Sequence, residues 1–190
     1  MIMSPGKWHL EVPRDIDDNL AVRKAVLEAA VGNVDFQNLL IERCTEDVLF
    51  YTNLFVWQFN PSKRGGAAIE PFITWPAQER LLIARPETHA QFRPYDRGML
   101  WCYENDKTMA VEKSRWQGAS WIQLIFQDWL CIFHKFVQVL NISRNEAAVD
   151  DGNRDSLFWK LRYMHQHLPT WMTGEIEDQK LYFHYHRTNS

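Results

Sequence analysis

Residues 111–121, VEKSRWQGASW, have the residue types and spacing of a loop that could bind a phosphate group. The common pattern of such loops is G-x-x-x-x-G-K-[ST], in which a lysine directly precedes the hydroxyl residue. Residues 118–120, GAS, keep the second glycine and the hydroxyl but have alanine in place of that lysine. Lys113 and Arg115 supply positive charge further upstream. The sequence therefore predicts a phosphate-binding loop with displaced cations.

The chemistry of such a loop rests on its backbone and on a few side chains. Backbone N–H groups and the N-terminus of a following helix face the anion, and Gly118 permits close approach of the backbone. In this arrangement Ser120 would coordinate Mg²⁺ through its hydroxyl, and Lys113 would neutralise the β- and γ-phosphates of a nucleotide. The competing interpretation is a structural turn with incidental cations, because short G-x-S matches are common.

An upstream segment could recognise the base of that nucleotide. Residues 71–80, PFITWPAQER, begin as an extended apolar segment and reach Pro76, a residue suited to the first turn of a helix. Gln78 then lies in that turn, and its amide can both donate and accept hydrogen bonds, as adenine recognition requires. Glutamine in a first turn also serves as a helix cap, so adenine recognition and capping remain alternatives.

A phosphate loop needs a strand before it and a helix after it. The predicted strands are residues 109–112, 136–143 and 180–186. The predicted helices of this half are residues 119–134 and 157–168, the second one capped by Asp155 and ended by Pro169. Alternating strands and helices predict an α/β fold, in which a parallel sheet is covered by helices.

The first 60 residues predict helices in place of strands. Helical patterns cover residues 15–29, 35–44 and 47–59, and residues 86–103 predict one or two more. Residues 47–59 are dense in aromatic side chains. A buried helix is the favoured interpretation of that density, and stacking of nucleic-acid bases is the alternative. Residues 60–68 predict a flexible loop.

Three segments together resemble the ATPase of the large terminase subunit, the motor that packages DNA into viral capsids. Members of that family carry a displaced lysine or arginine in a loop of the form K-S-R-x-x-G-x-S, as residues 113–120 do here. Residues 71–80 resemble the adenine-reading Q motif of terminases and helicases. Residues 141–169 resemble a terminase strand that ends in Ser-Arg, an acidic turn and a helix that begins Asp-Ser-Leu-Phe-Trp-Lys. The resemblance runs from about residue 45 to the C-terminus.

The resemblance implies the ATP-binding portion of a bacteriophage terminase, with a P-loop NTPase-like parallel sheet and a Walker A loop. It implies a helical N-terminal segment over residues 1–60 and the front portion of the ATPase domain, an incomplete domain, over residues 69–190. Arg115 resembles the loop arginine that stabilises charge on the transferring phosphoryl group, so it is the predicted catalytic residue. ATP and Mg²⁺ are the implied cofactors.

The resemblance also implies a set of contacts. The partners would be the portal protein, the small terminase subunit, double-stranded DNA and further copies in a homo-oligomeric ring. The place of action would be the host cytoplasm and, transiently, the portal vertex of the capsid. The residues predicted to contact the nucleotide are Gln78, Lys113, Ser114, Arg115, Trp116, Gln117, Gly118, Ala119 and Ser120, and Ser120 is also the predicted metal ligand.

Hydrolysis requires a second, acidic strand that holds Mg²⁺ and orients water. No run of four apolar residues followed by Asp-Glu comes after the loop. Asp150 and Asp151 fall in a predicted turn, and Asp128 falls inside the predicted loop helix. We therefore do not expect hydrolysis by these 190 residues alone. A catalytically inactive nucleotide-binding or interaction module is the main alternative, and a helicase-like translocase, which usually has the G-K-[ST] lysine, is a third.

Composition sets wider limits on the function. Apolar residues make up 46% of the chain and nine residues are tryptophan, which favours a folded globular protein. The formal net charge of −3 gives no support for nucleic-acid binding by charge alone. Three widely spaced cysteines, Cys44, Cys102 and Cys131, predict free thiols in a reducing compartment. No export signal or apolar run of about 20 residues is evident, so a cytosolic protein without a membrane partner is expected.

A group of histidines near the C-terminal end of the sequence is a candidate metal site. The group comprises His165, His167, His184 and His186. The last two would share one face of a strand, as metal ligands can, but no cysteine or carboxylate stands at matching spacing. A polar strand face is the favoured interpretation.

Overall fold

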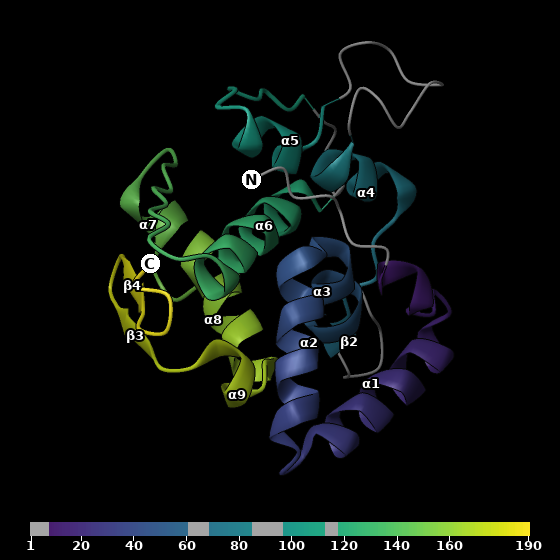
Figure 1. Cartoon of the computed structure of the whole chain (residues 1–190). Coiled ribbons are helices and arrows are strands. Elements are labelled where there is room, and N and C mark those ends of the chain that lie inside the picture. Colours follow the sequence, from purple (N-terminus) through teal and green to yellow (C-terminus); the bar gives the residue numbers. More distant parts are fainter. Residues whose placement is uncertain (1–7, 61–68, 85–96, 113–117) are drawn as a thin grey trace.

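The computed structural model describes residues 8–60, 69–84, 97–112 and 118–190, and the chain in these ranges is a mixture of helices and short strands (Figure 1). The helices are η1 (Trp8–Glu11), α1 (Ile16–Ala30), α2 (Val34–Glu46), α3 (Val48–Phe55), α4 (Pro76–Ile83), α5 (Met99–Glu104), α6 (Ala119–Phe133), α7 (Glu146–Val149), α8 (Leu157–His167) and α9 (Thr170–Thr173). The strands are β1 (Trp57–Phe59), β2 (Ile69–Pro71), β3 (Ile176–Gln179) and β4 (Tyr182–Tyr185).

The three predicted N-terminal helices are confirmed, and each begins at a side chain that caps it. Asp15 accepts hydrogen bonds from two backbone N–H groups at the start of α1. Asn33 accepts from the backbone N–H of Phe36 in α2, and Asp47 caps α3 in the same manner. These side chains satisfy N–H groups that have no partner within the helix, which explains why the helices begin where they do.

Helix α3 confirms the buried-helix interpretation of the aromatic segment. All eight of its residues are buried, and the helix packs against α2, α4 and α6. The predicted helix over residues 47–59 nevertheless ends early, at Phe55. Residues Trp57–Phe59 form β1, which pairs antiparallel with β2. The aromatic residues of the segment therefore serve two elements, a buried helix and one strand of a hairpin.

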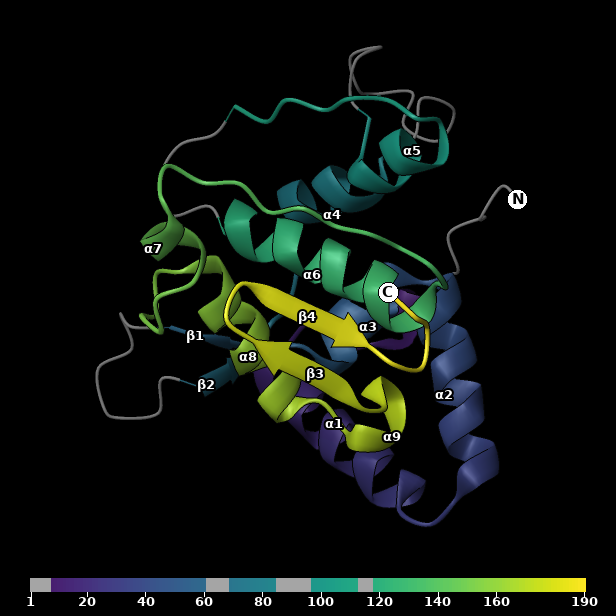
Figure 2. The same ribbon diagram turned by 90° about the vertical axis from the view of Figure 1, so that its left-hand side faces the viewer.

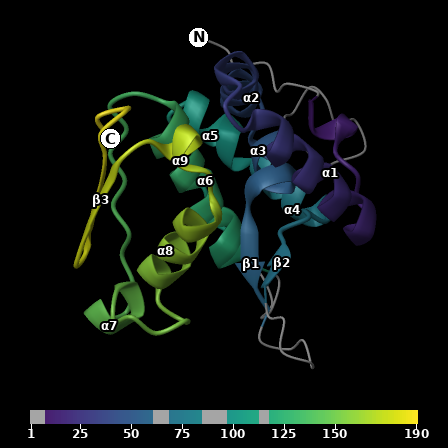
Figure 3. The same ribbon diagram turned by 90° about the horizontal axis from the view of Figure 1, so that it is seen from below.

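Helix α6, predicted from its apolar sequence, lies in the middle of the molecule (Figures 1 and 3). Ten of its 15 residues are buried, and it packs against α2, α3, α4 and α8. Trp129 is 1% exposed, and its indole N–H donates a 2.6 Å hydrogen bond to the carbonyl oxygen of Cys44. Burying one large apolar side chain stabilises the fold by roughly 1.5–3 kcal/mol, so the buried residues of α6 contribute strongly to the core.

The sheets are antiparallel. Strand β3 pairs with β4, with Ile176 opposite Tyr185 and Gln179 opposite Tyr182. The prediction of a strand over residues 180–186 is confirmed in β4, but its place in a parallel sheet is wrong. Only two residues separate β3 from β4, and a parallel pair needs a crossover of a dozen or more residues. The hairpin lies along the outside of the molecule, on the side of α8 away from α1 (Figures 2 and 3).

The two other predicted strands are absent from the described residues. Residues 109–112 and 136–143 are assigned neither strand nor helix. Val137 is buried, whereas Leu140 is 80% and Ile142 81% exposed. No backbone hydrogen bond joins residues 138–143 to another described residue. Strand formation needs a partner's backbone, and β-prone residues alone do not supply one. The parallel sheet expected from the sequence is thus not part of the described structure.

The start of α8 corrects the predicted cap. The helix is confirmed over Leu157–His167, but its N-cap is Ser156, whose hydroxyl accepts from the backbone N–H of Trp159 at 3.4 Å. Asp155, the predicted cap, is exposed and lies one residue earlier. Serine and aspartate are about equally good caps, so the sequence could not distinguish these neighbours.

One hydrophobic core joins both halves of the chain. It includes Val12 and Leu40 from the N-terminal helices, Ile125 from α6, Met164 from α8 and Tyr185 from β4. The three cysteines are buried free thiols. Among the described residues, no helix has the length and hydropathy needed to cross a bilayer.

Candidate functional site

The start of α6 has the backbone geometry of an anion-binding helix end. Gly118 is its N-cap residue, with φ +69° and ψ 9°, a left-handed conformation that glycine adopts without strain. Gly118 provides no capping side chain, and Ala119 and the exposed Ser120 follow it in the first turn. The first N–H groups of a helix lack intrahelical partners and carry partial positive charge. The start of α6 therefore has the polarity that favours an anion.

The start of α4 carries the predicted base-reading residue. Pro76 is the first residue of the helix, as predicted, and Trp75 is its N-cap. The side-chain oxygen of Gln78 accepts a 3.0 Å hydrogen bond from the backbone N–H of Trp75. The capping alternative for Gln78 is thus realised. An amide oxygen has two lone pairs and the amide nitrogen has two N–H donors, so the bond to Trp75 by itself does not decide between capping and base recognition.

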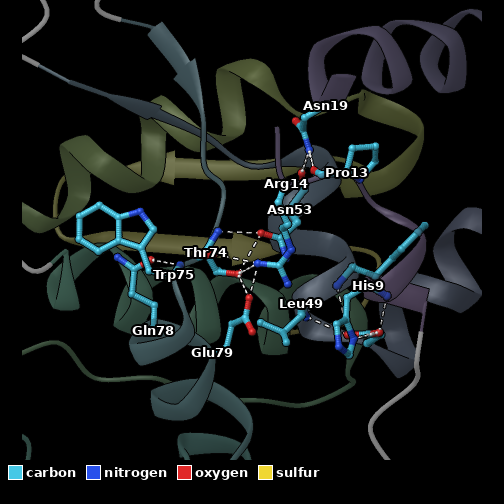
Figure 4. A network of polar contacts seen from close by, with 12 residues as sticks. His9, Pro13, Arg14, Asn19, Leu49, Asn53, Thr74, Trp75, Gln78 and Glu79 are labelled. Carbon is cyan, nitrogen blue, oxygen red and sulfur yellow. Dashed lines mark hydrogen bonds and ion pairs between the residues drawn. The ribbon is translucent and has the colours of Figure 1, made fainter. Parts of the chain in front are cut away.

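A network of polar contacts fixes the chain just before α4 (Figure 4). The backbone N–H and the hydroxyl of Thr74 both donate to the side-chain oxygen of Asn53, at 2.8 and 3.0 Å. Arg14 donates to the carbonyl oxygen of Thr74 at 2.8 Å and also pairs with Glu79. Thr74 and Asn53 are buried. Because buried hydrogen bonds resist displacement, these contacts hold the chain at Thr74, directly before Trp75 and α4.

The two predicted motifs are in contact. A Cβ atom added to Gly118 would lie 2.8 Å from the amide nitrogen of Gln78, which is closer than real Cβ contacts. Gln78 is 8% exposed. The absent side chain of Gly118 thus makes room for the side chain of Gln78, and the tertiary structure joins the starts of α4 and α6.

A pocket of about 750 Å³ opens beside this contact. Its lining comes from the β1–β2 hairpin, the start of α4, the start of α6 and the start of α8. The lining residues are Gln58, Phe59, Asn60, Glu70, Phe72, Ile73, Trp75, Gln78, Gly118, Ala119, Ser120, Trp121, Arg154, Asp155, Trp159 and Lys160. Aromatic walls with a few convergent polar groups are typical of small-molecule sites, and the volume is within the usual range for them. We call this the α4–α6–α8 pocket.

Residues around the start of α8 form a wall of the pocket that the sequence did not predict. Arg154 lies over the ring of Phe59, with its guanidinium carbon 4.4 Å from the ring centroid. The ammonium of Lys160 donates to the carbonyl oxygens of Asp155 and Ser156, at 2.7 and 3.3 Å. Burial lowers the pKa of Lys160 below its usual value, while the charge of Asp155 opposes that effect. No local pattern in the sequence links these residues to the loop.

Two carboxylates also line the pocket. One oxygen of Glu70 accepts from the side-chain amides of Gln58 and Asn60, each at 2.9 Å. Asp155 is exposed at the pocket. Neither residue fits the sequence pattern of an acidic strand, because neither one follows an apolar run after the loop. Carboxylate oxygens are ligands of the kind that Mg²⁺ prefers, and Glu70 and Asp155 line the same pocket as Ser120.

The rest of the predicted loop lies outside the described residues. This applies to Lys113, Ser114, Arg115, Trp116 and Gln117. Of the predicted nucleotide contacts, Gln78, Gly118, Ala119 and Ser120 are therefore the ones that the structure describes, and it brings all four to the same pocket.

The histidine group divides between a buried network and the surface. One side-chain oxygen of Asp128 lies 2.7 Å from Nε2 of His165 and accepts from the hydroxyl of Tyr185, also at 2.7 Å. The other oxygen accepts from the hydroxyl of Tyr51 at 2.8 Å. Burial, followed by the charge of Asp128, raises the pKa of both tyrosines well above its usual value. The described residues contain no group of three or more His, Cys, Asp or Glu placed to hold a metal ion.

No protein family, no curated protein and no solved structure matches the chain. The functional inference therefore rests on the sequence motifs and on the α4–α6–α8 pocket.

Proposed function

We propose that the α4–α6–α8 pocket binds Mg²⁺-ATP, and that the chain is the ATP-binding portion of a large terminase subunit. The main support is the contact between Gln78 and Gly118. These residues come from the two segments that the sequence assigned separately to base recognition and to phosphate binding. A chance match to either motif gives no reason for the two to meet at one pocket.

The chemistry of the pocket supports a nucleotide as its ligand. The N-terminus of α6 favours phosphate, and the hydroxyl of Ser120 is available for Mg²⁺. The rings of Trp75, Trp121 and Trp159 line the same space and offer flat apolar surfaces for a base. Lys113 and Arg115 would add charge to the phosphate end, in the roles predicted from the sequence.

Within the proposed motor, ATP hydrolysis would drive DNA into a preformed capsid. Arg115 would stabilise charge on the transferring phosphoryl group. The partners would be the portal protein, the small terminase subunit, DNA and copies of the same subunit in a ring. These roles follow from the resemblance in the loop, the segment before α4 and the segment that leads into α8.

Calorimetry with Mg²⁺-ATP tests the proposal. Lys113→Ala and Ser120→Ala each remove one predicted contact, and a charge-assisted contact is worth roughly 1.5–3 kcal/mol. We expect affinity to fall about tenfold to a hundredfold in Lys113→Ala. Lys135→Ala removes an exposed lysine outside the pocket and should leave affinity unchanged. Equal affinity of the parent and both loop variants would refute nucleotide binding by this loop.

A further inference from the structure

The start of α8 brings two cations to the α4–α6–α8 pocket. Arg154 lies in the turn before the helix, and Lys160 lies in the first turn of α8. Both line the pocket together with Gly118 and Ser120. Positive side chains that share a pocket with a helix N-terminus favour an oxyanion ligand.

Arg154 is positioned but keeps its hydrogen-bond donors. Its guanidinium lies over the ring of Phe59, and within the described ranges it makes no hydrogen bond or ion pair. A cation–π contact uses the flat face of the guanidinium and leaves its five N–H donors at the edge. Arginine presented in this way suits the bidentate recognition of a phosphate group.

Lys160 is held by main-chain oxygens. Two carbonyl groups, those of Asp155 and Ser156, accept from its ammonium, which has three N–H donors. Burial disfavours the charged ammonium, as its lowered pKa indicates. An anion in the pocket would offset that burial, because an opposite charge nearby favours the charged form.

The pocket also contains negative charge that a bare phosphate would meet. Glu70 and Asp155 are its two lining carboxylates. A nucleotide that arrives with Mg²⁺ avoids most of this repulsion, since the metal neutralises part of the phosphate charge. The combination of cations, carboxylates and a serine hydroxyl therefore suits a metal-bound polyphosphate better than a single phosphate group.

We propose that Arg154 and Lys160 contact the β- and γ-phosphates of the bound nucleotide. The inference rests on the proposed function, and it adds two ligand-contacting residues that the sequence motifs did not include. Each cation should contribute to affinity according to the number of phosphates, most for ATP, less for ADP and little for AMP.

The test compares the affinities of Mg²⁺-ATP, ADP and AMP for the full 190-residue chain and its variants by calorimetry. We expect Arg154→Ala and Lys160→Ala each to weaken ATP binding about tenfold, and AMP binding by less than about twofold. Lys160→Arg keeps the charge and should restore most of the ATP affinity. Arg144→Ala removes an exposed arginine that does not line the pocket, so it serves as the matched control.

Three outcomes separate the possibilities. If ATP binds but both variants leave its affinity unchanged, or weaken ATP and AMP equally, the inference is wrong while the proposed function stands. The second comparison measures binding of tripolyphosphate, which has the phosphates of ATP but no nucleoside. If it binds and requires Arg154 and Lys160 while ATP shows no advantage over it, the cations hold polyphosphate and the assignment to a nucleotide fails. If neither ATP nor tripolyphosphate binds the parent chain, both proposals are overturned. Melting temperatures check that each variant is folded.

Discussion

At the residue scale, Gly118 meets two separate constraints. Its backbone is left-handed, at φ +69°, and the amide nitrogen of Gln78 occupies the space that a Cβ atom would take. Gly32 has nearly the same φ, +67°, but nothing lies within 4 Å of its Cβ position. The chain thus contains a natural comparison between backbone strain alone and strain combined with a close contact.

Gly32→Ala should destabilise the fold by about 1 kcal/mol, because only left-handed backbone strain is added. Gly118→Ala should cost more, roughly 2–3 kcal/mol, because the new methyl group also displaces Gln78. The double variant Gly118→Ala/Gln78→Ala should recover part of that difference, since it removes the group in conflict. Urea unfolding of the parent, Gly118→Ala, Gln78→Ala and the double variant measures the coupling. Additive costs would show that the contact has no energetic weight.

Gln78 combines a cap with a predicted role in base recognition, and two substitutions separate these roles. Gln78→Glu keeps an oxygen that can accept from Trp75 but removes the amide donor, whereas Gln78→Ala removes both. If Gln78 reads adenine, both variants should lose the preference for ATP over GTP, and Gln78→Glu should stay close to the parent in stability. Competition binding with ATP and GTP is the measurement. A preference retained in both variants would confine Gln78 to capping.

At the element scale, Asp128 joins four elements that are distant in sequence. Its carboxylate lies on α6 and contacts Tyr51 of α3, His165 of α8 and Tyr185 of β4. The residue is 1% exposed, so its partners replace water almost entirely. A buried carboxylate is tolerated only when it is fully hydrogen-bonded. The network therefore fixes α6 relative to α3, α8 and the β3–β4 hairpin. The first turn of α6 lines the α4–α6–α8 pocket.

Asp128→Ala should destabilise the fold by about 3–5 kcal/mol, because it leaves buried polar partners without an acceptor. Tyr51→Phe and Tyr185→Phe should each cost about 1 kcal/mol, since each removes a single hydrogen bond. Tyr182 is the matched control on the same strand, because it is 48% exposed, and Tyr182→Phe should be close to neutral. Guanidinium unfolding gives the values. A loss below about 1 kcal/mol in Asp128→Ala would contradict the structural role of the network.

At the scale of the whole molecule, two groups make stability depend on pH in the same direction. Hydrogen bonds from Arg162 lower the pKa of Asp150 below its usual 3.8, and Asp150 also accepts from the backbone N–H of Leu181. Burial lowers the pKa of His134 below its usual 6.5. In both cases the unfolded chain binds the proton more readily than the folded chain, so stability falls as the pH falls.

The free energy of unfolding should therefore decrease in two steps on acidification. The contribution of His134 is fully present above about pH 6.5 and is lost as the pH falls below that value. The contribution of Asp150 is fully present above about pH 4 and is lost as the pH falls through its lowered pKa. His134→Phe should flatten the first step and Asp150→Asn the second. Urea unfolding from pH 8 to pH 3 measures both, and an unchanged profile in either variant would remove that group as a cause.

The sequence by itself determined most helices and the local geometry of two motifs. Asp15, Asn33 and Asp47 are short polar caps placed before apolar helical patterns, and such signals act over a few residues. Pro76 marked the first turn of α4, and Gly118 marked the turn before α6, because each residue has a narrow or unusual backbone preference. Local chemistry decides these features, so local sequence can predict them.

The tertiary structure alone decided which residues meet. Residues 136–143 have the composition of a strand, yet no described backbone pairs with residues 138–143, since pairing depends on what lies alongside. Two features join segments that are far apart in the chain. Gln78 contacts Gly118, and Arg154 and Lys160 line the same pocket. Such contacts depend on how α4, α6 and α8 pack against one another. Packing is a property of the whole core, and no single segment of the sequence encodes it.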